Sequence, residues 1–446
     1  MADRIFKRKL YDQMLAWKQD FKGKSALLIK GARRVGKSTI AEEFAKKEYE
    51  SYILIDFSRV SKEVNDLFQD LSDLDYFFLT LQLLYKKDLK ERKSVIIFDE
   101  VQMQPLARQA IKHLVKDQRY DYIETGSLLS IKKNIKDIVI PSEETRITML
   151  PMDYEEFRWA LGDTTTFSLI KMAFDKRKPL GEDVNRRLLR DFRLYMLIGG
   201  MPQAVNEYLD TNSFSKVDQM KRNIIELYED DFRKIDPTGR ASLLFDAIPA
   251  ELNKNASRYQ VSSVDRHSRQ ARLGELIADM ADSMTVNIAY HADDPGVEMA
   301  LNKDPDHYKL FLGDTGLFVT LAFKDKDFTE NIIYEKLLYD KMSANMGYIY
   351  ENMVAQMLKA AGNELFYYTF PSETSNHNHE VDFMISKKNK ICPIEVKSSG
   401  YRAHASLDHF IEKYSDRVLE KYLVYTRDLK RDGEVLCVPV YMVPFL

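Results

Sequence analysis

The segment GARRVGKST, residues 31–39, combines glycine, lysine and hydroxyl side chains at the spacing that binds a phosphate chain. Gly31 and Gly36 allow backbone amides to wrap around phosphate oxygens, and the N-terminus of a following helix adds partial positive charge. Lys37 is expected to reach the β- and γ-phosphate oxygens of ATP, and Ser38 to bind Mg²⁺. The predicted nucleotide-binding loop also includes Ala32, Arg33, Arg34, Val35 and Thr39.

A second pair of residues suited to this chemistry, Asp99 and Glu100, follows the apolar segment 95–98. An acid at the end of a buried strand can hold the Mg²⁺ of a bound nucleotide, and the next carboxylate can polarise the attacking water. Acids after an apolar strand are common alone, but these lie downstream of a complete phosphate-binding loop. The two motifs together predict that the chain hydrolyses ATP.

The segments around these motifs alternate between apolar strands and helices, which predicts a parallel sheet covered by helices on both faces. The expected strands are 26–29, 51–57, 95–98, 120–127 and 145–150. The expected helices are 40–47, 62–90 and 105–116. A strand inserted between the phosphate-binding loop and the paired acids is typical of the AAA+-like branch of P-loop ATPases.

Thr125 and Ser127 stand at the end of the strand that follows the two acids. In AAA+-type enzymes a polar residue at this strand end senses the γ-phosphate, so both are candidate nucleotide-binding residues. Ser127 would serve equally well as the N-cap of a following helix, and the two roles are compatible.

Near the C-terminus, four charged residues are spaced for metal-dependent chemistry on a phosphodiester. Glu351 lies in the amphipathic helix 347–362, Asp382 in the strand EVDFMI, and Glu395 and Lys397 on the next strand. Because Glu395 and Lys397 are two positions apart, they share one face of a sheet. Asp382 and Glu395 could hold Mg²⁺ or Mn²⁺, while Lys397 orients or activates the attacking water. Acids and a lysine on two strands are also common without such a role.

The histidines and cysteines near these residues are weaker candidates for metal ligands. His377 and His379 precede the strand of Asp382 and could assist a metal, although histidines in such loops are usually solvated. Cys392 and Cys437 are the only cysteines and lack Cys-x-x-Cys spacing, which argues against a disulfide framework and a thiolate zinc site.

The composition limits the class of protein. The 446 residues carry a net charge of −3, so any DNA site must be a local patch rather than the whole surface. Residues 1–19 lack the apolar core of a signal peptide, and no segment approaches the roughly 18–20 apolar residues of a membrane span. We therefore expect a cytoplasmic protein without a membrane-bound part.

Seven segments between residues 27 and 399 together resemble a group of prokaryotic AAA+-type ATPases that carry a C-terminal restriction-endonuclease-like domain. They are LIKGARRVGKST, SVIIFDEVQ, IETGS, TRITMLPMDYEEF, YMLIGGMPQAV, HYKLFLGDTGL and YENMVAQML…EVDFMI…PIEVKSS. Glu351, Asp382, Glu395 and Lys397 match the PD-(D/E)XK pattern of such nucleases. The resemblance implies an ATPase joined to a metal-dependent nuclease.

The resemblance also implies roles for two further residues. It places Arg146 where it could face a phosphate, in its own chain or from a neighbouring subunit of an oligomer, whereas the alternative is a solvated strand-end arginine. The turn GGMP, residues 199–202, resembles a Gly-x-Pro turn in which Pro202 packs against the adenine and couples nucleotide state to domain angle. The alternative is an ordinary loop between helices.

Residues 240–322 resemble a winged-helix unit, which binds DNA in some proteins and serves as a structural lid in others. The best local basic cluster lies in the segment 262–276 and consists of Arg266, His267, Arg269 and Arg272. A helix with four basic residues is more often a solvated face than a nucleic-acid site.

The sequence therefore predicts an α/β protein with an AAA+-like P-loop parallel-sheet core, a helical and winged-helix region and a small restriction-endonuclease-like α/β domain. The expected boundaries are 1–155 for the ATPase core, 156–235 for a helical lid, 236–325 for the winged-helix-like domain and 326–446 for the nuclease-like domain. The leading hypothesis is that ATP hydrolysis controls a DNA nuclease in DNA processing or defence. The alternative is an ATP-dependent switch or scaffold whose nuclease-like domain only binds a partner or nucleic acid.

Overall fold

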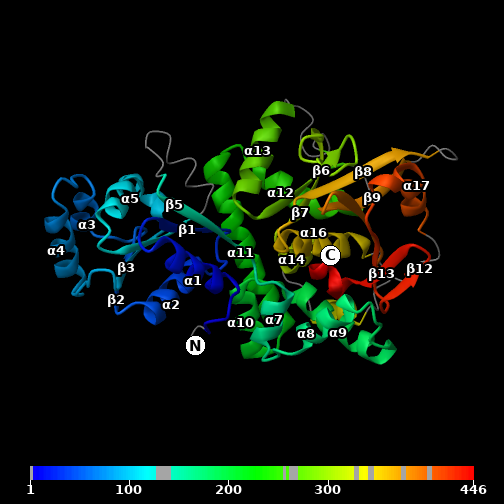
Figure 1. The fold of residues 1–446 in the computed structure, drawn as a ribbon, viewed down its shortest axis with the longest axis horizontal. Coiled ribbons are helices and arrows are strands. Elements are labelled where there is room, and N and C mark those ends of the chain that lie inside the picture. Colours follow the sequence, from blue (N-terminus) through cyan, green and yellow to red (C-terminus); the bar gives the residue numbers. More distant parts are fainter. Residues whose placement is uncertain are drawn as a thin grey trace. The chain divides into compact units, whose positions relative to one another are not determined.

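The chain divides into two compact units, shown in the computed structural model of Figure 1. The first comprises residues 1–150 and 282–284, and the second residues 151–281 and 285–446. The structure describes residues 4–126, 142–254, 258–260, 270–325, 331–339, 346–372, 378–398 and 404–446. The finer division into four domains remains a prediction.

Within the described residues, the first unit contains a five-stranded parallel sheet in the order β2-β3-β4-β1-β5. Its strands are β1 (Ala26–Gly31), β2 (Ser51–Asp56), β3 (Ser94–Asp99), β4 (Asp121–Gly126) and β5 (Glu144–Met149). Every expected strand is present, and the parallel sheet is confirmed. β4 lies between β1 and β3, so the strand ends that carry the two motifs are brought to one edge of the sheet.

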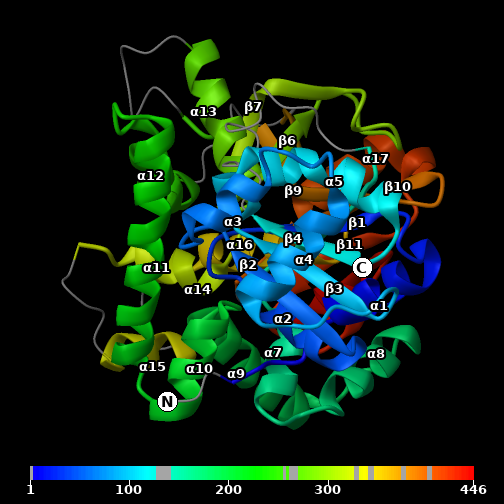
Figure 2. The same cartoon turned by 90° about the vertical axis from the view of Figure 1, so that its left-hand side faces the viewer.

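Helices cover both faces of this sheet, because successive strand residues are apolar on opposite sides (Figure 2). Leu27 and Ile29 of β1 pack with α1 (Leu10–Phe21) and α2 (Lys37–Glu48). On the other face, Leu28 belongs to the core formed with α3 (Lys62–Leu67), α4 (Leu74–Tyr85) and α5 (Pro105–Asp117).

The prediction of one helix over residues 62–90 is wrong, since the segment forms the two helices α3 and α4. The Ser61 hydroxyl accepts from the Val64 amide and starts the first helix, and the Asp73 carboxylate accepts from the Tyr76 amide at 2.9 Å and starts the second. N-capping side chains therefore interrupt an otherwise apolar periodic segment.

The second unit begins with helices and ends with a mixed sheet. Its helices are α7 (Tyr154–Ala160), α8 (Thr166–Asp175), α9 (Glu182–Ile198), α10 (Pro202–Thr211), α11 (Phe214–Ile235), α12 (Arg240–Asn253), α13 (Gln270–Asp282), α14 (Thr315–Ala322), α15 (Asn331–Leu338), α16 (Gly347–Ala360) and α17 (Ala405–Tyr414). None of the helices in the described part of the chain is long and apolar enough to cross a membrane.

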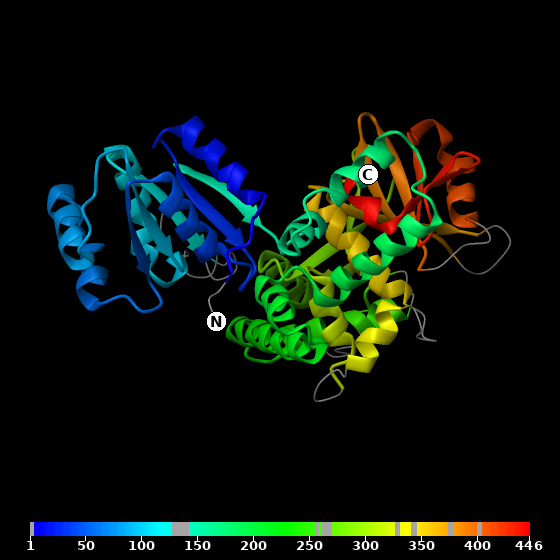
Figure 3. The same ribbon diagram turned by 90° about the horizontal axis from the view of Figure 1, so that it is seen from below.

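Eight strands of the described residues form the mixed sheet, in the order β12-β13-β11-β10-β9-β8-β6-β7. They are β6 (Val286–Ala292), β7 (Lys303–Leu312), β8 (Leu365–Pro371), β9 (Asn378–Lys387), β10 (Lys390–Val396), β11 (Lys421–Tyr425), β12 (Lys430–Asp432) and β13 (Val435–Pro439). The helix α16 contacts β6, β7, β8 and β10. Figure 3 shows the second unit from below, with its C-terminal strands coloured orange to red. Along the chain, α16, β8, β9, β10, α17 and β11 follow one another in an αβββαβ order.

The strands β6 and β7 come from the segment that was expected to be a winged-helix domain. β6 pairs in parallel with β8, with Ala289 opposite Leu365, and antiparallel with β7. In the described residues this segment does not form a sheet of its own, so its strands belong to the same layer as the C-terminal strands. Arg266, His267 and Arg269 of the predicted basic cluster lie outside the described residues, and the side chain of Arg272 is not described either.

A buried ionic network holds the helical part of the second unit together. The Lys221 ammonium of α11 donates to the carbonyls of Leu197 at 2.7 Å and Gly316 at 3.0 Å. The Asp218 carboxylate, one turn earlier, accepts from the hydroxyls of Tyr334 and Thr320, each at 2.7 Å. Burial lowers the pKa of Lys221 to about 8, although the nearby Asp218 and Asp314 oppose this shift.

Candidate functional site

The phosphate-binding loop has the backbone conformation that its glycines predict. A side chain at Gly31 would collide with the carbonyl oxygen of Met149 on the adjacent strand, so only glycine fits. Gly36 has a φ of 102°, and Arg34 has a φ of 67°, both in the left-handed region. Gly36 then caps α2 at its N-terminus, where the first amides of the helix are available to a phosphate.

Lys37 lies almost fully buried at the start of α2, and its ammonium folds back over the loop. It donates to the carbonyl of Gly31 at 3.1 Å and to the carbonyl of Ala32 at 2.9 Å. The charge is thus held at the mouth of the loop by backbone oxygens. Lys37 is positioned to bind the β- and γ-phosphate oxygens of a nucleotide seated on these amides.

Three oxygen-bearing side chains from α2, β3 and β4 meet beside Lys37. The Ser38 hydroxyl donates to Asp99 Oδ1 at 2.6 Å, and the Thr125 hydroxyl donates to the same oxygen. Asp99 and Thr125 are both buried, at the ends of neighbouring strands. Hydroxyl and carboxylate oxygens are the donors that Mg²⁺ prefers, so Ser38 and Asp99 fit the predicted metal site.

Glu100 follows Asp99 in the left-handed region, with a φ of 54°, which turns its side chain out of the strand direction. Its backbone amide donates to the Thr125 hydroxyl at 3.4 Å, and its carboxylate accepts from the Gln102 side-chain amide. Thr125 therefore contacts the Asp99 carboxylate and the Glu100 backbone, and its role as a γ-phosphate sensor remains a prediction. Ser127 lies outside the described residues.

Two residues of this site were missed by the sequence analysis. Gln102 holds the Glu100 carboxylate, as described above. Arg8 is buried and donates to the carbonyl of Val35 in the phosphate-binding loop at 3.1 Å and to the carbonyl of Leu150 at 2.5 Å. Gln102 ends the segment SVIIFDEVQ, two residues after Glu100, so its place beside the two acids was a signal that was not used. Arg8 lies in the run Lys7-Arg8-Lys9, 23 residues before the loop, and gives no signal of this contact in the sequence.

Arg146 lies on the edge strand β5, level with Leu28 and three residues before the strand end at Met149. Its guanidinium pairs with Glu144 at 2.6 Å, and Glu144 also pairs with the buried Arg108 at 2.7 Å. This placement groups Arg146 with a buried ionic cluster in its own chain. A role toward phosphate remains a prediction.

The turn at residues 199–202 is fixed within the second unit. The Gly200 amide donates to the Asp314 carboxylate at 2.5 Å, and its carbonyl accepts from the Met152 amide at 2.7 Å. A side chain at Gly200 would collide with the Met152 backbone. Pro202 occupies the first turn of α10, where its missing amide hydrogen costs nothing. Its contact with adenine remains a prediction.

The second group of predicted residues gathers around α16, β9 and β10. Glu351 lies on α16, Asp382 on β9, Glu395 on β10, and Lys397 directly after β10. Lys397 pairs with Glu395 at 2.6 Å, and the Asp382 carboxylate accepts from the Val396 amide at 2.6 Å. The structure therefore brings all four together, as their spacing suggested.

Two more charged residues, Lys309 and Glu380, belong to this group. The Lys309 ammonium pairs with the Glu380 carboxylate, although β7 and β9 are separated by β8 and β6 in the sheet order. Glu380 is two positions before Asp382 and shares its strand face, so alternation could have identified it. Lys309 could not be identified in this way, because only the sheet topology brings β7 to this place.

The acids of this group carry more negative charge than the lysines neutralise. Burial raises the pKa of Asp382, and the neighbouring Glu351 and Glu380 raise it further, while Lys309 opposes them. Burial likewise raises the pKa of Glu351. In Lys397, burial lowers the pKa, but the Glu395 carboxylate outweighs it and the net shift is upward.

A metal ion would satisfy one atom of this group in particular. Glu395 Oε2 is buried and has no hydrogen-bond partner among the described residues. Such an unsatisfied carboxylate oxygen is costly in a protein interior. Carboxylate oxygens suit Mg²⁺ and Mn²⁺, so the donor set of Asp382 and Glu395 fits the predicted metal. His377 lies outside the described residues, and the His379 ring packs on Phe370 and His409.

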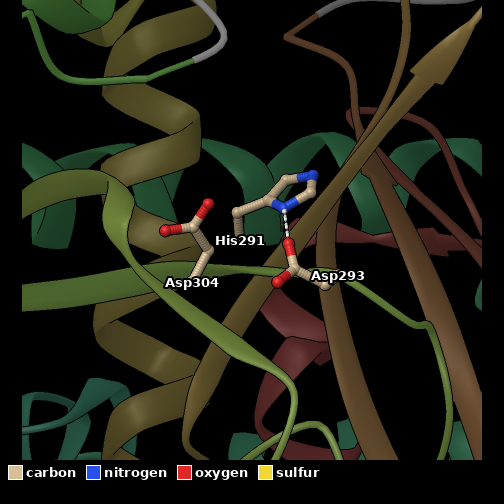
Figure 4. Close-up of side chains that lie close together, drawn as sticks. All are labelled: His291, Asp293 and Asp304. Atoms are coloured by element: carbon tan, nitrogen blue, oxygen red, sulfur yellow. Dashed lines mark ion pairs between the residues drawn. The ribbon is translucent and has the colours of Figure 1, made fainter.

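The most compact group of metal-ligating side chains in the described residues is a different one, His291, Asp293 and Asp304, whose ligand atoms all lie within 4.8 Å of one another (Figure 4). The backbone amide of Thr369 donates to His291 Nε2 at 3.3 Å, so the hydrogen of the neutral ring is on Nδ1. Nδ1 faces Asp293 at 3.5 Å, and Asp304 pairs with His307 at 2.5 Å. Thr369 thus occupies one ring nitrogen of His291, and Asp304 is already paired with His307, so this group is less open to a metal than its short distances suggest.

Comparison with protein-family models divides the chain into three segments. Residues 23–158 match an AAA domain, residues 189–327 match a domain of unknown function (DUF8612), and residues 346–442 match a second domain of unknown function (DUF4143). A search of curated proteins gives no significant match. The first match covers the phosphate-binding loop, both acids, Thr125 and Arg146.

Solved structures with some similarity include a Walker-type ATPase, PABY2304, of Pyrococcus abyssi. It is 17% identical, with a TM-score of 0.41, over 71% of this chain and 96% of that chain. The protein VC1899 from Vibrio cholerae is 11% identical, with a TM-score of 0.18, over 94% of this chain and 95% of that chain. Scores this low carry no argument. The family match, the strand order and the loop geometry are sufficient: residues 23–158 form a P-loop ATPase domain of the AAA type, which binds and hydrolyses ATP.

Proposed function

We propose that the nucleotide state of the ATPase domain controls a metal-dependent DNA nuclease in the second unit, in DNA processing or defence. The observation that carries this proposal is the convergence of Glu351, Asp382, Glu395 and Lys397 around a buried carboxylate oxygen without a partner. These residues follow the order that the resemblance implies: an acid on the helix α16, an acid on the strand β9, and Glu-x-Lys at the end of β10.

Asp382 and Glu395 are the residues that would hold Mg²⁺ or Mn²⁺, and the ion would neutralise charge on the phosphodiester. The backbone amide of Val396 fixes one oxygen of Asp382, and Lys397 fixes one oxygen of Glu395. Each carboxylate is thus oriented by a donor on or beside β10. Two oriented carboxylates on adjacent antiparallel strands are a rigid support for a cation.

Lys397 acts in this proposal as a cation and not as a base. The upward shift of its pKa keeps the ammonium protonated at neutral pH, so it has no lone pair to accept a proton from water. A protonated lysine can orient the attacking water and balance the negative charge that develops on the phosphate. About 41% of the Lys397 side chain is exposed, which leaves it accessible to a substrate.

The control by ATP is expected to involve the turn at residues 199–202. Asp314 and Met152 hold Gly200 from two sides, and Pro202 starts α10 immediately after it. A displacement of this turn on nucleotide binding would therefore be felt by α14, which begins at Thr315. Changing Pro202 to alanine should alter how an ATP analogue changes the protease sensitivity of the second unit.

The test is nicking of supercoiled plasmid by the full-length protein with Mg²⁺ or Mn²⁺, with and without ATP. Asp382→Asn should lose cleavage, whereas Asp416→Asn, at an exposed acid outside the group, should cleave like the wild type. Lys37→Ala should retain the cation site but lose the effect of ATP. Cleavage at the wild-type rate by Asp382→Asn would show that a contaminating nuclease or another site is responsible.

A second candidate function is an ATP-dependent switch or scaffold with a catalytically silent C-terminal domain. It is favoured by the Glu395–Lys397 ion pair, which already engages one carboxylate, and by the net charge of −3. This candidate predicts no nicking of plasmid, single-stranded or branched DNA with either cation. It also predicts that ATP changes the protease sensitivity of the second unit in the wild type and not in Lys37→Ala.

A further inference from the structure

Lys309 is a buried cation that no catalytic motif of the sequence includes. About 7% of its side chain is exposed, and the ammonium lies 5.3 Å from the centre of the Tyr367 ring and pairs with Glu380. Burying an ammonium group is costly unless carboxylates compensate it closely. The groups that interact with it are Glu380, Glu351 and Asp382, which belong to the candidate metal site.

The position of Lys309 makes this site a composite one. Lys309 lies in the segment that matches DUF8612, whereas Glu351, Asp382, Glu395 and Lys397 lie in the segment that matches DUF4143. The link between the segments is the pairing of β6 with both β7 and β8. Neither segment alone therefore contains all the charges of the site.

The charges of the site are suited to one divalent cation. The four carboxylates Glu351, Glu380, Asp382 and Glu395 face the two ammonium groups of Lys309 and Lys397, which leaves a formal charge of −2. Without Lys309 the formal charge would be −3, and the Glu380 carboxylate would lose the cation with which it pairs. An additional free carboxylate next to Asp382 could then turn toward a bound cation as an extra ligand.

We propose that Lys309 is a positioning residue of the candidate nuclease site, which restrains Glu380 and sets the charge of the site to match a single divalent cation. This inference rests on the proposed function. It adds a residue from outside the αβββαβ segment and assigns Glu380 the role of a counter-ion rather than a ligand. Because Lys309 is buried, it acts through Glu380 and the site charge and not by touching DNA.

The experiment compares Mn²⁺ binding, by titration calorimetry at pH 8, with plasmid nicking in full-length variants. Lys309→Met should bind Mn²⁺ roughly tenfold more tightly or with a second equivalent, because an opposing charge is removed, and yet cleave at least tenfold more slowly. Glu380→Gln should bind Mn²⁺ roughly tenfold more weakly than the wild type. The reason is that the Lys309 charge is then no longer balanced by Glu380 and opposes the bound cation. Lys309→Arg should retain both properties of the wild type.

The double variant Lys309→Met/Glu380→Gln restores the formal charge of −2 and should return Mn²⁺ affinity to near the wild-type value, which is a double-mutant cycle with a large interaction. A merely structural lysine would instead weaken Mn²⁺ binding in Lys309→Met, without rescue by the second change. If Lys309→Met does not fold, as judged by circular dichroism, Glu380→Gln alone tests the inference. Weaker Mn²⁺ binding in Glu380→Gln then supports it, and tighter or unchanged Mn²⁺ binding overturns it. Wild-type affinity in both single variants overturns this inference, whereas a wild type that neither binds Mn²⁺ nor cuts overturns the proposed function and this inference with it.

Discussion

The two candidate sites of this protein are built in different ways. The nucleotide site is made largely of backbone: glycine amides, a helix N-terminus and two carbonyls that hold Lys37. The C-terminal site is made of side chains, with buried and half-buried carboxylates set against two lysines. The first is assembled mainly from one contiguous loop, and the second from three separate stretches of chain. A site of the first kind is visible in a sequence, whereas the second kind requires the fold.

The largest difference between the two sites should appear with Lys37→Ala. We expect ATP turnover to fall by roughly 10²–10³-fold or more, since Lys37 is the cation expected to stabilise charge on the β- and γ-phosphates. Mn²⁺ binding to the second unit should not change. The measurements are phosphate release and titration calorimetry, with the exposed Lys47→Ala as the matched control. Normal turnover in Lys37→Ala would remove the loop from catalysis.

Glu100→Gln should separate binding from hydrolysis at the first site. We expect ATP to bind with near wild-type affinity and turnover to drop by about 10²-fold, because an amide cannot polarise the attacking water as a carboxylate does. Fluorescent-nucleotide binding and phosphate release measure the two quantities. Gln102→Ala, which removes the partner of Glu100, should lower turnover less than Glu100→Gln does.

The second unit depends on buried side-chain charges for stability as well as for its candidate site. Asp314→Ala should destabilise it by about 3 kcal/mol, because the amides of Gly200 and Leu317 would lose a buried acceptor. Chemical unfolding followed by tryptophan fluorescence and circular dichroism measures this change. An exposed acid such as Asp416, changed to alanine, should alter stability by less than about 0.5 kcal/mol.

A pH dependence should arise from Lys221, whose pKa is lowered to about 8. Between pH 8 and 10.5 the unfolded chain keeps this proton while the folded chain has lost it, so stability rises with pH in that window. From pH 8 to 9.5 the wild type should gain about 2 kcal/mol relative to Lys221→Met, which lacks the group. If the free energies of unfolding of the two proteins change with pH in parallel, the lowered pKa of Lys221 is contradicted.

The smallest expected effect tests whether the C-terminal acids repel one another. In the cation-free protein at neutral pH, Asp382→Asn should raise the stability of the second unit by about 1 kcal/mol, because it relieves the desolvation and the repulsion by Glu351 and Glu380 that raise the pKa of Asp382. Added Mn²⁺ should raise the melting temperature of the wild type and not of Asp382→Asn. A lower melting temperature in the cation-free variant would show that Asp382 is structural.

The sequence predicted those parts of the molecule in which neighbours along the chain are also neighbours in space. Gly31 to Thr39 form one strand–loop–helix junction, and Lys397 lies two positions after Glu395, directly after β10, so residue spacing was sufficient for both. The paired strand ends of Asp99 and Thr125 followed from the parallel sheet. Helix breaks depend on single capping contacts, such as that of Asp73, which apolar periodicity does not reveal.

Pairings between distant segments escaped prediction. Lys309 reaches the C-terminal acids because β6 pairs with both β7 and β8. The periodicity of residues 286–312 does not indicate that β6 pairs with β8. Arg8 escaped for the same reason, since its acceptors at Val35 and Leu150 are distant in sequence. Local physical chemistry therefore identifies most of a site and misses the charges that arrive from elsewhere in the fold.

The strand β7 carries a mechanical consequence. Lys309 lies near its end, and five residues later Asp314 holds the Gly200 amide. Asp314 lies two residues beyond the end of β7 at Leu312, and β7 is hydrogen-bonded to β6 along Val286–Ala292, which fixes its register. A displacement of the Gly200 turn would thus reach the Lys309–Glu380 ion pair through five residues of backbone, and a large shift would have to break pairs of this ladder. The turn at residues 199–202 and the Lys309–Glu380 ion pair would then be mechanically coupled through one short stretch of backbone.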